Sequence, residues 1–185
     1  VKISGHTGQR VGSMGFPSTF IEVLGPASDD VGWLNAGAEI VVHGNAGNGC
    51  ANAMAQGKIF IAGNIGARGM TMTKHNPRFA PPELWVLGSA GDYFGEFMAG
   101  GIAVICGHEP QNPQNVLGYR PFVGMVGGKV FFRGPHSGYS QPDAKDTSSM
   151  SVLHPRPVSL ATFMDFLYSS IAVSSSPFPA YERAR

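Results

Sequence analysis

The sequence predicts an all-β fold, a single-stranded right-handed β-helix with coils of about 19 residues. Short apolar segments end in a regularly spaced glycine, which we call the anchor glycine. The anchors are Gly5, Gly25, Gly44, Gly63, Gly88, Gly107 and Gly134. Their intervals are 20, 19, 19, 25, 19 and 27 residues, and a fixed period near 20 indicates stacked repeats. No six-residue sub-repeat is visible, which favours a right-handed over a left-handed stack.

Two apolar columns precede the anchors. Two residues before the anchor stand Val23, Val42, Ile61, Val86, Ile105 and Phe132. Four residues before it stand Ile21, Ile40, Ile59, Leu84, Ala103 and Val130. Residues two apart in a strand share a face. We therefore expect a strand before each anchor, parallel to its neighbours, with this face in a common core.

A third inward column follows the anchors, and short strands separated by glycine bends are expected on that part of each coil. Six residues after the anchor come Val11, Val31, Cys50 and Phe94. Cys50 occupies the place of Val or Phe, so it is expected to be a buried small hydrophobe. The next column consists of Gly12, Gly32, Ala51 and Gly95, where the backbone turns or packs too closely for a larger side chain.

The column three residues before the anchor is expected to point away from the core. It contains Glu22 and then Val41, Phe60, Trp85, Val104 and Phe131. A contiguous apolar stripe on an outer face indicates a covered surface, and we predict that the last five residues form a partner interface. Either the tail of the chain or another protein could cover them. Cys106 is expected on the same side, as an interface or exposed thiol.

The repeats predict two parts of the chain. Residues 1–134 form the repeat domain, and 135–185 comprise a polar linker, a short helix and an irregular tail. The helix is predicted because Leu160, Phe163, Met164, Leu167 and Ile171 follow helical spacing. Proline-containing insertions at 70–82 and 108–121 are expected to be loops that leave the stack, and loops on a rigid scaffold commonly carry function.

Composition narrows the class of function. Charged residues make up 14% of the chain and the net charge is +1, so we expect no nucleic-acid partner. No apolar run approaches 18 residues, and we expect no membrane partner. Two cysteines without a CxxC pair, and the lack of a signal-peptide pattern, favour a cytoplasmic location. The low share of charged residues predicts that much of the surface is covered.

The residues show no motif for catalysis, cofactor or metal binding. The glycine-rich segment Gly44–Gly49 superficially suggests a phosphate loop, but it repeats with the period and leads back into a strand instead of a helix. No HExxH or GxSxG motif is present. His6 and His108 share a register position but are five coils, roughly 24 Å, apart. We therefore assign no catalytic, cofactor-binding or metal residue.

The repeats resemble a known family. Gly5–Gly12, Gly25–Gly44 and Gly88–Gly107 are similar to the GXGXG domain, which forms the C-terminal part of the glutamate synthase large subunit and in some organisms is a free-standing subunit. Gly63–Gly69 and the insertion after it resemble the free-standing form. The resemblance covers about residues 3–134. One of the subunits of formylmethanofuran dehydrogenase shares the same pattern.

The resemblance implies a right-handed β-helix without catalytic residues, which packs as a spacer between a glutaminase and an FMN and iron–sulfur synthase barrel. It therefore predicts a structural, non-catalytic subunit of a glutamate-synthase-like oxidoreductase complex in nitrogen metabolism. FMN and the iron–sulfur cluster are expected in partner subunits, and none is expected in this chain. Two alternatives remain open: a structural subunit of a formylmethanofuran-dehydrogenase-like, metal-dependent oxidoreductase complex, and a self-sufficient enzyme built on a β-helix.

Overall fold

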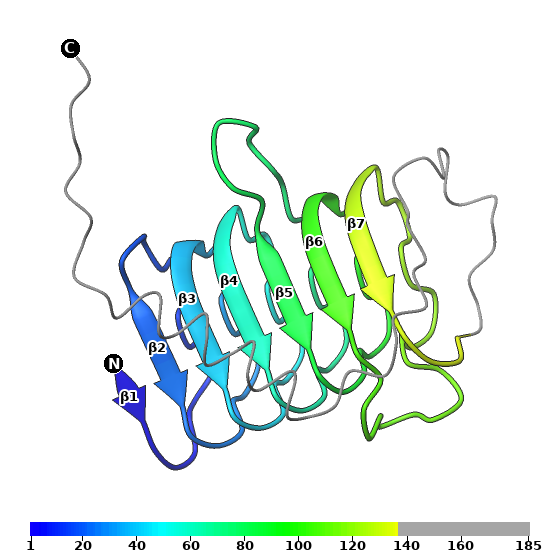
Figure 1. Cartoon of the computed structure of the whole chain (residues 1–185), viewed down its shortest axis with the longest axis horizontal. Coiled ribbons are helices and arrows are strands. Elements are labelled where there is room, and N and C mark those ends of the chain that lie inside the picture. The colour runs from blue at the N-terminus through cyan, green and yellow to red at the C-terminus, as the bar shows by residue number, and fades with distance from the viewer. Residues whose placement is uncertain (137–185) are drawn as a thin grey trace. The chain divides into compact units, whose positions relative to one another are not determined.

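The computed structural model of this chain describes residues 1–136, and these contain seven strands that form one parallel sheet (Figure 1). The strands are β1 Lys2–Ile3, β2 Phe20–Val23, β3 Ala36–Val42, β4 Gln56–Ile61, β5 Glu83–Val86, β6 Ala99–Ile105 and β7 Gly127–Phe132. Their order in the sheet is their order in the sequence. The predicted linker, helix and tail from residue 137 onward lie outside the described residues.

The register of the sheet follows the anchor period. Val23 pairs with Val42, Val42 with Ile61, Ile61 with Val86, Val86 with Ile105, and Ile105 with Phe132. The column four residues before the anchor is paired in the same way, from Ile21 to Val130. Both predicted columns are therefore confirmed as continuous ladders across the sheet.

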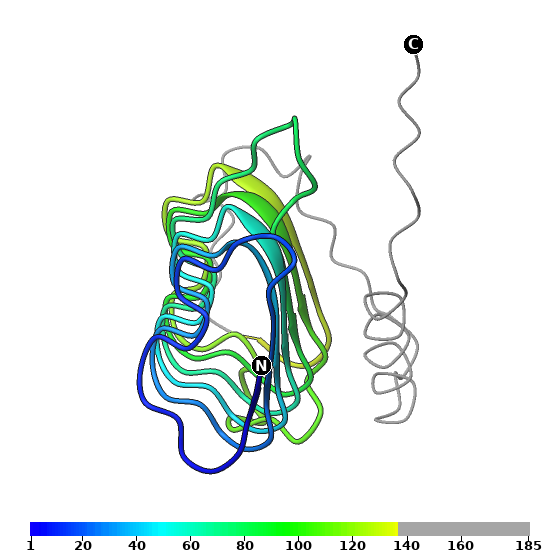
Figure 2. The same ribbon diagram turned by 90° about the vertical axis from the view of Figure 1, so that its left-hand side faces the viewer.

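The other side of each repeat is a turn that stacks on the turns of its neighbours (Figure 2). Three alternating residues of each turn have φ between 49° and 68°. For example, Asp30, Gly32 and Leu34 do so in one repeat, and Arg68, Met70 and Met72 do so two repeats later. The amide of Leu34 donates to Asn52 in the following repeat, whereas that of Gly32 donates to Val11 in the preceding one. The turns are thus joined by backbone hydrogen bonds in both directions.

The expectation of a single-stranded right-handed β-helix is therefore wrong. Each repeat supplies one strand, and the strands form a single open, all-parallel sheet. Residues 1–136 contain no helix. The segments that we expected to be further short strands contain left-handed residues, and alternating positive φ is incompatible with the extended conformation of a strand. The spacing of the glycines predicts bends between several short strands. In the structure these glycines belong to one turn in each repeat, and the turns stack on one another.

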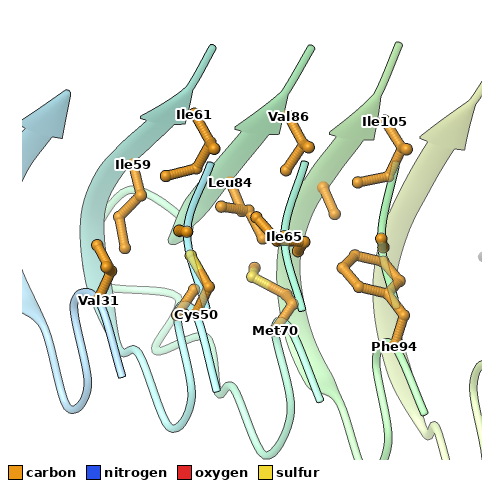
Figure 3. Close-up of a cluster of buried hydrophobic side chains, with 14 of the residues drawn as sticks. Val31, Cys50, Ile59, Ile61, Ile65, Met70, Leu84, Val86, Phe94 and Ile105 are labelled. Atoms are coloured by element: carbon orange, nitrogen blue, oxygen red, sulfur yellow. The ribbon is translucent and has the colours of Figure 1, made fainter. Parts of the chain in front are cut away.

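The core lies between the sheet and the stacked turns (Figure 3). Ile59, Ile61 and Leu84 point from the strands into the interior, and Cys50 and Phe94 point into it from the turns. All five side chains are at most 1% exposed. Cys50 is thus the buried small hydrophobe that its column predicted.

Side-chain amides and carboxylates add a second set of contacts between repeats. Asp29 Oδ1 accepts from the Asn48 amide at 2.7 Å, and Asn48 Oδ1 accepts from the Ala67 amide at 2.8 Å. Asn45 Oδ1 accepts from the Asn64 amide in the same manner. Each side chain replaces a backbone acceptor for the next repeat, so these polar residues stabilise the stack.

The turn positions next to the core leave no room for larger side chains in some repeats. Gly32 has φ 66°, and a Cβ atom there would overlap Ile59 Cδ1. We expect Gly32→Ala to lower the free energy of unfolding by about 2 kcal/mol, from left-handed strain and overpacking. Thermal and urea unfolding measure the loss. Gly8→Ala is the control, because a Cβ there meets nothing within 4 Å; equal loss in both variants would contradict the packing argument.

Candidate protein-interaction surface

The outer face of the sheet carries the residues that the sequence predicted as an interface. Val41 is paired with Phe60, Phe60 with Trp85, Trp85 with Val104, and Val104 with Phe131. We call these five residues the apolar row. They alternate with core residues along β3 to β7 and do not belong to the core cluster. The structure thus brings all five predicted residues together in one line across the sheet.

The members of the apolar row differ in burial. Val41 is 1% and Phe60 0% exposed, although both point away from the core. Trp85, Val104 and Phe131 are only partly buried. The Phe60 and Trp85 rings stack with centroids 6.3 Å apart and planes 25° apart. Accessible apolar surface on this face therefore begins at Trp85 and continues to Phe131.

A column of charged residues flanks the apolar row two residues earlier in β3, β4 and β5. Glu39 pairs with Lys58, and Lys58 with Glu83. Lys58 Nζ lies 3.7 Å from Glu83 Oε1, and the other Glu83 oxygen accepts from Trp85 Nε1 at 3.0 Å. Glu83 thus fixes the orientation of the Trp85 ring. We did not expect this column from the sequence, although the position five residues before the anchor shows it directly.

Glu39 is the least favourably placed of these charges. Its Oε1 atom is buried and accepts no hydrogen bond within the described part of the chain. Burial raises the pKa of this carboxyl; the charge of Lys58 lowers it, and that of Glu83 raises it further. Ionised Glu39 therefore destabilises the folded state.

Glu22 begins the same outward column as the apolar row and forms an ionic cluster instead. Its two oxygens lie 3.1 Å from Lys2 Nζ and 3.0 Å from His43 Nε2. The hydrogen bond from Lys2 is the largest cause that lowers the Glu22 pKa, and burial opposes it. The polar end of the column at β1 and β2 thus differs chemically from the apolar remainder.

Cys106 is not an exposed thiol. It is 8% exposed, and burial raises its pKa to about 11, although Arg133 lowers it. Cys50 is fully buried, and burial raises its pKa to about 12. The expectation of an exposed thiol is therefore wrong, because the protein encloses the Cys106 side chain within reach of the Arg133 charge; its place at an interface stays a prediction.

The two insertions form one groove each with the edges of the stack. The second insertion contributes Gln111 and Asn112 to a groove of about 380 Å³ that Asn48, Ser89 and Asp92 also line. Several polar groups there already bond within the protein: Asn64 Oδ1 accepts from Ser89 and Gln111, and Asp92 Oδ1 accepts from the Tyr119 amide. The first insertion places His75 beside Gly100 and Lys129 in a groove of about 340 Å³.

Residues 1–136 also lack two features that would indicate other functions. No three His, Cys, Asp or Glu side chains in this region are close enough together to hold a metal ion. No helix in this region is long and apolar enough to span a membrane. The predicted lack of catalytic, cofactor and metal residues stays a prediction.

The chain is a repeat protein, built from a single parallel sheet and stacked, glycine-rich turns. The surface features found in residues 1–136 include the apolar row and the two grooves. The model of the GXGXG motif family matches residues 1–154. The chain belongs to this family, as the sequence resemblance predicted, and the family is associated with glutamate-synthase-like proteins. No curated protein and no solved structure shows significant similarity to the chain.

The buried Glu39 oxygen gives a pH-dependent prediction. A carboxyl with a raised folded-state pKa favours folding at low pH, and this advantage is lost as the pH rises through the folded-state pKa. We expect Glu39→Gln to raise the melting temperature at pH 8, with a smaller gain at pH 4.5, because the raised pKa of Glu39 increases its protonated fraction at acidic pH. Glu83→Gln is the matched control. This variant should lower the melting temperature, because the substitution weakens the contacts of residue 83 with Lys58 and Trp85. The same shift at both pH values for Glu39→Gln would refute the assignment.

The two thiols give a second prediction for the folded chain. Because both pKa values are raised far above 8 and both side chains are buried, neither thiol should react with a disulfide reagent such as DTNB at pH 8 within minutes. Two equivalents should react after unfolding in guanidinium chloride. A fast native phase assigned to Cys106 by mass spectrometry would show that this side chain is accessible.

Proposed function

We propose that the chain is a non-catalytic structural subunit of a glutamate-synthase-like complex. The observation that carries the proposal is the apolar row, five paired residues on the face of the sheet directed away from the core. Family membership supports the type of complex. In this proposal the repeats are a rigid spacer, and the reaction takes place in partner subunits.

The docking surface on this face is the accessible end of the row, at Trp85, Val104 and Phe131. Their strands are held rigidly by the ladder, so a partner would bind a surface that is already ordered, and little conformational entropy would be lost. Trp85 is oriented by Glu83, and oriented aromatic side chains are enriched among the residues that dominate binding energy. The nearby charges of Lys58 and Glu83 would form the polar rim.

The partners in this proposal are a glutaminase-like subunit and an FMN-barrel synthase-like subunit. FMN and an iron–sulfur cluster would be held by the partner subunits, and the complex would act in the cytoplasm. The low share of charged residues, 14%, supports an extensively covered surface. A pterin-containing oxidoreductase subunit recovered as the partner would instead assign the chain to a formylmethanofuran-dehydrogenase-like complex.

The proposal is tested with tagged full-length chain purified from its own cells, followed by native mass spectrometry. We expect the wild type to retain glutaminase-like and flavin-containing partners. Phe131→Asp should weaken partner retention at least tenfold, because a charge within an apolar contact must be desolvated. Circular dichroism and thermal unfolding establish that the variant is folded.

Gln114→Asp is the control variant, since Gln114 is exposed in the second insertion and outside the row. Equal partner retention by the two variants would reject the row as the docking surface. Flavin or iron absorbance, or glutaminase activity, in the isolated chain would contradict the non-catalytic role.

A further inference from the structure

The side of the stack formed by the turns carries a second apolar row, distinct from the one on the sheet. The residues are those nine positions after the anchor, together with their counterpart in the last repeat. They are Met14, Leu34, Ala53, Met72, Phe97 and Gly124. We call them the turn row. Met14, Met72 and Phe97 are 58%, 57% and 55% exposed, and Leu34 is 38% exposed.

The fold itself does not require large side chains in the turn row. Ala53 and Gly124 occupy the same left-handed position, with φ 53° and 66°. A non-glycine residue in this conformation costs about 1 kcal/mol or more. Methionine, leucine and phenylalanine therefore add strain here and bury little apolar surface within the described chain. A row of exposed apolar residues on one face marks an interaction surface.

A column of charged and aromatic residues runs beside the turn row. It consists of the residues five positions after the anchor and their counterpart in the last repeat, which also have positive φ: Arg10, Asp30, Gly49, Arg68, Tyr93 and Arg120. The side chains of Arg10 and Arg68 are both 60% exposed, and that of Asp30 is 30% exposed. We call this the charged turn column. Each repeat therefore contributes one residue to the charged turn column and one to the turn row, and the order of these residues along the stack is fixed by the sequence.

We propose that the turn side binds a second copy of this chain as an antiparallel, two-fold symmetric dimer centred on the third repeat. A two-fold axis across the stack reverses the order of the repeats and keeps each position within the repeat. Centred on Ala53 and Gly49, it places Leu34 opposite the partner's Met72, and Met14 opposite the partner's Phe97. Asp30 then faces the partner's Arg68. The smallest side chains lie on the axis, where the backbones approach most closely.

Other symmetric arrangements of the same face are less favourable. If the two-fold axis is moved half a repeat toward the end of the chain, Arg10 lies opposite the partner's Arg120. If it is moved half a repeat toward the start, Arg10 lies opposite the partner's Arg68. A centre on the fourth repeat brings the two Arg68 side chains together. Like charges across an interface disfavour association. A parallel dimer would place the charged turn column against the apolar turn row.

The dimer is expected to be weak. Met14 and Phe97 are four repeats apart, about 19 Å along the stack at the usual strand spacing. A face of this length and the width of one turn buries an area at the low end of the range for specific protein–protein interfaces. Arg68 also has partners in its own chain, since it lies 3.2 Å from Glu96 and over the Tyr93 ring. The dimer is independent of the proposed function, which concerns the opposite side of the repeats (Figure 2).

Cysteine cross-linking of the full-length chain tests the arrangement. Ala53→Cys should form a covalent dimer with a short bismaleimide, because the two copies of this position meet at the axis. Met14→Cys alone should not, since its two copies lie about four strand spacings, roughly 19 Å, apart. An equimolar mixture of Met14→Cys and Phe97→Cys should cross-link between unlike chains. The native thiols are buried, so the wild type reports the background.

Light scattering after gel filtration supplies an independent measurement. We expect the wild type to shift from monomer toward dimer as its concentration rises, and Ala53→Arg to remain monomeric because it places two cations on the axis. Gln114→Arg is the control and should behave as wild type. A monomeric wild type at all concentrations without the Ala53→Cys product, or equal cross-linking of Met14→Cys alone, would overturn the proposal.

Discussion

The rest of the structure depends on the left-handed residues of the stacked turns. In each of six repeats three alternating residues have positive φ, and in the four inner repeats all three amides donate to the neighbouring repeats. In these four repeats the first and third residues bond to the following repeat, and the second bonds to the preceding one, as Asp30, Leu34 and Gly32 illustrate. This alternation fixes the distance between turns at the spacing of the strands, so sheet and turns can rise together.

The conformational free-energy cost of the left-handed residues is offset by the hydrogen bonds and the core packing that these residues make possible. A left-handed residue is unfavourable when it carries a side chain, yet here Arg68, Met70 and Met72 are all left-handed within one turn. Each is held by a hydrogen bond to an adjacent repeat. Reversing the chain so tightly keeps Met70 in the core at 0% exposure and directs Met72 outward. The turn thus serves both the core and the surface.

The two outer faces follow from the same repeat but differ in character. On the sheet, side chains alternate strictly, so the apolar row and the charged residues Glu39, Lys58 and Glu83 share the outer face, two residues apart along their strands. On the turns, the alternating left-handed residues place Arg68 and Met72 outward with Met70 buried between them. A repeat domain with two chemically distinct faces can contact two different surfaces without any change in its fold.

The residues of the apolar row could be predicted from the sequence because equivalent positions can be compared between repeats. A single strand such as Glu83–Val86 does not reveal which face is buried, but six aligned copies do, and they placed Val41, Phe60, Trp85, Val104 and Phe131 together. The extent of burial could not be predicted. Val41 and Phe60 are out of contact with solvent, and Cys106 is enclosed, because burial depends on neighbours outside the repeat itself.

By itself the sequence determined the repeat, the strand register, the inward columns and the family. These depend on the spacing of apolar residues and glycines, which is local and periodic. Only the tertiary structure decided that each repeat has one strand, that the turns are left-handed, and that Met14, Leu34, Met72 and Phe97 are exposed in a row. Backbone conformation at a residue such as Met72 is set by hydrogen bonds from adjacent repeats, and the residue's own identity argues against it.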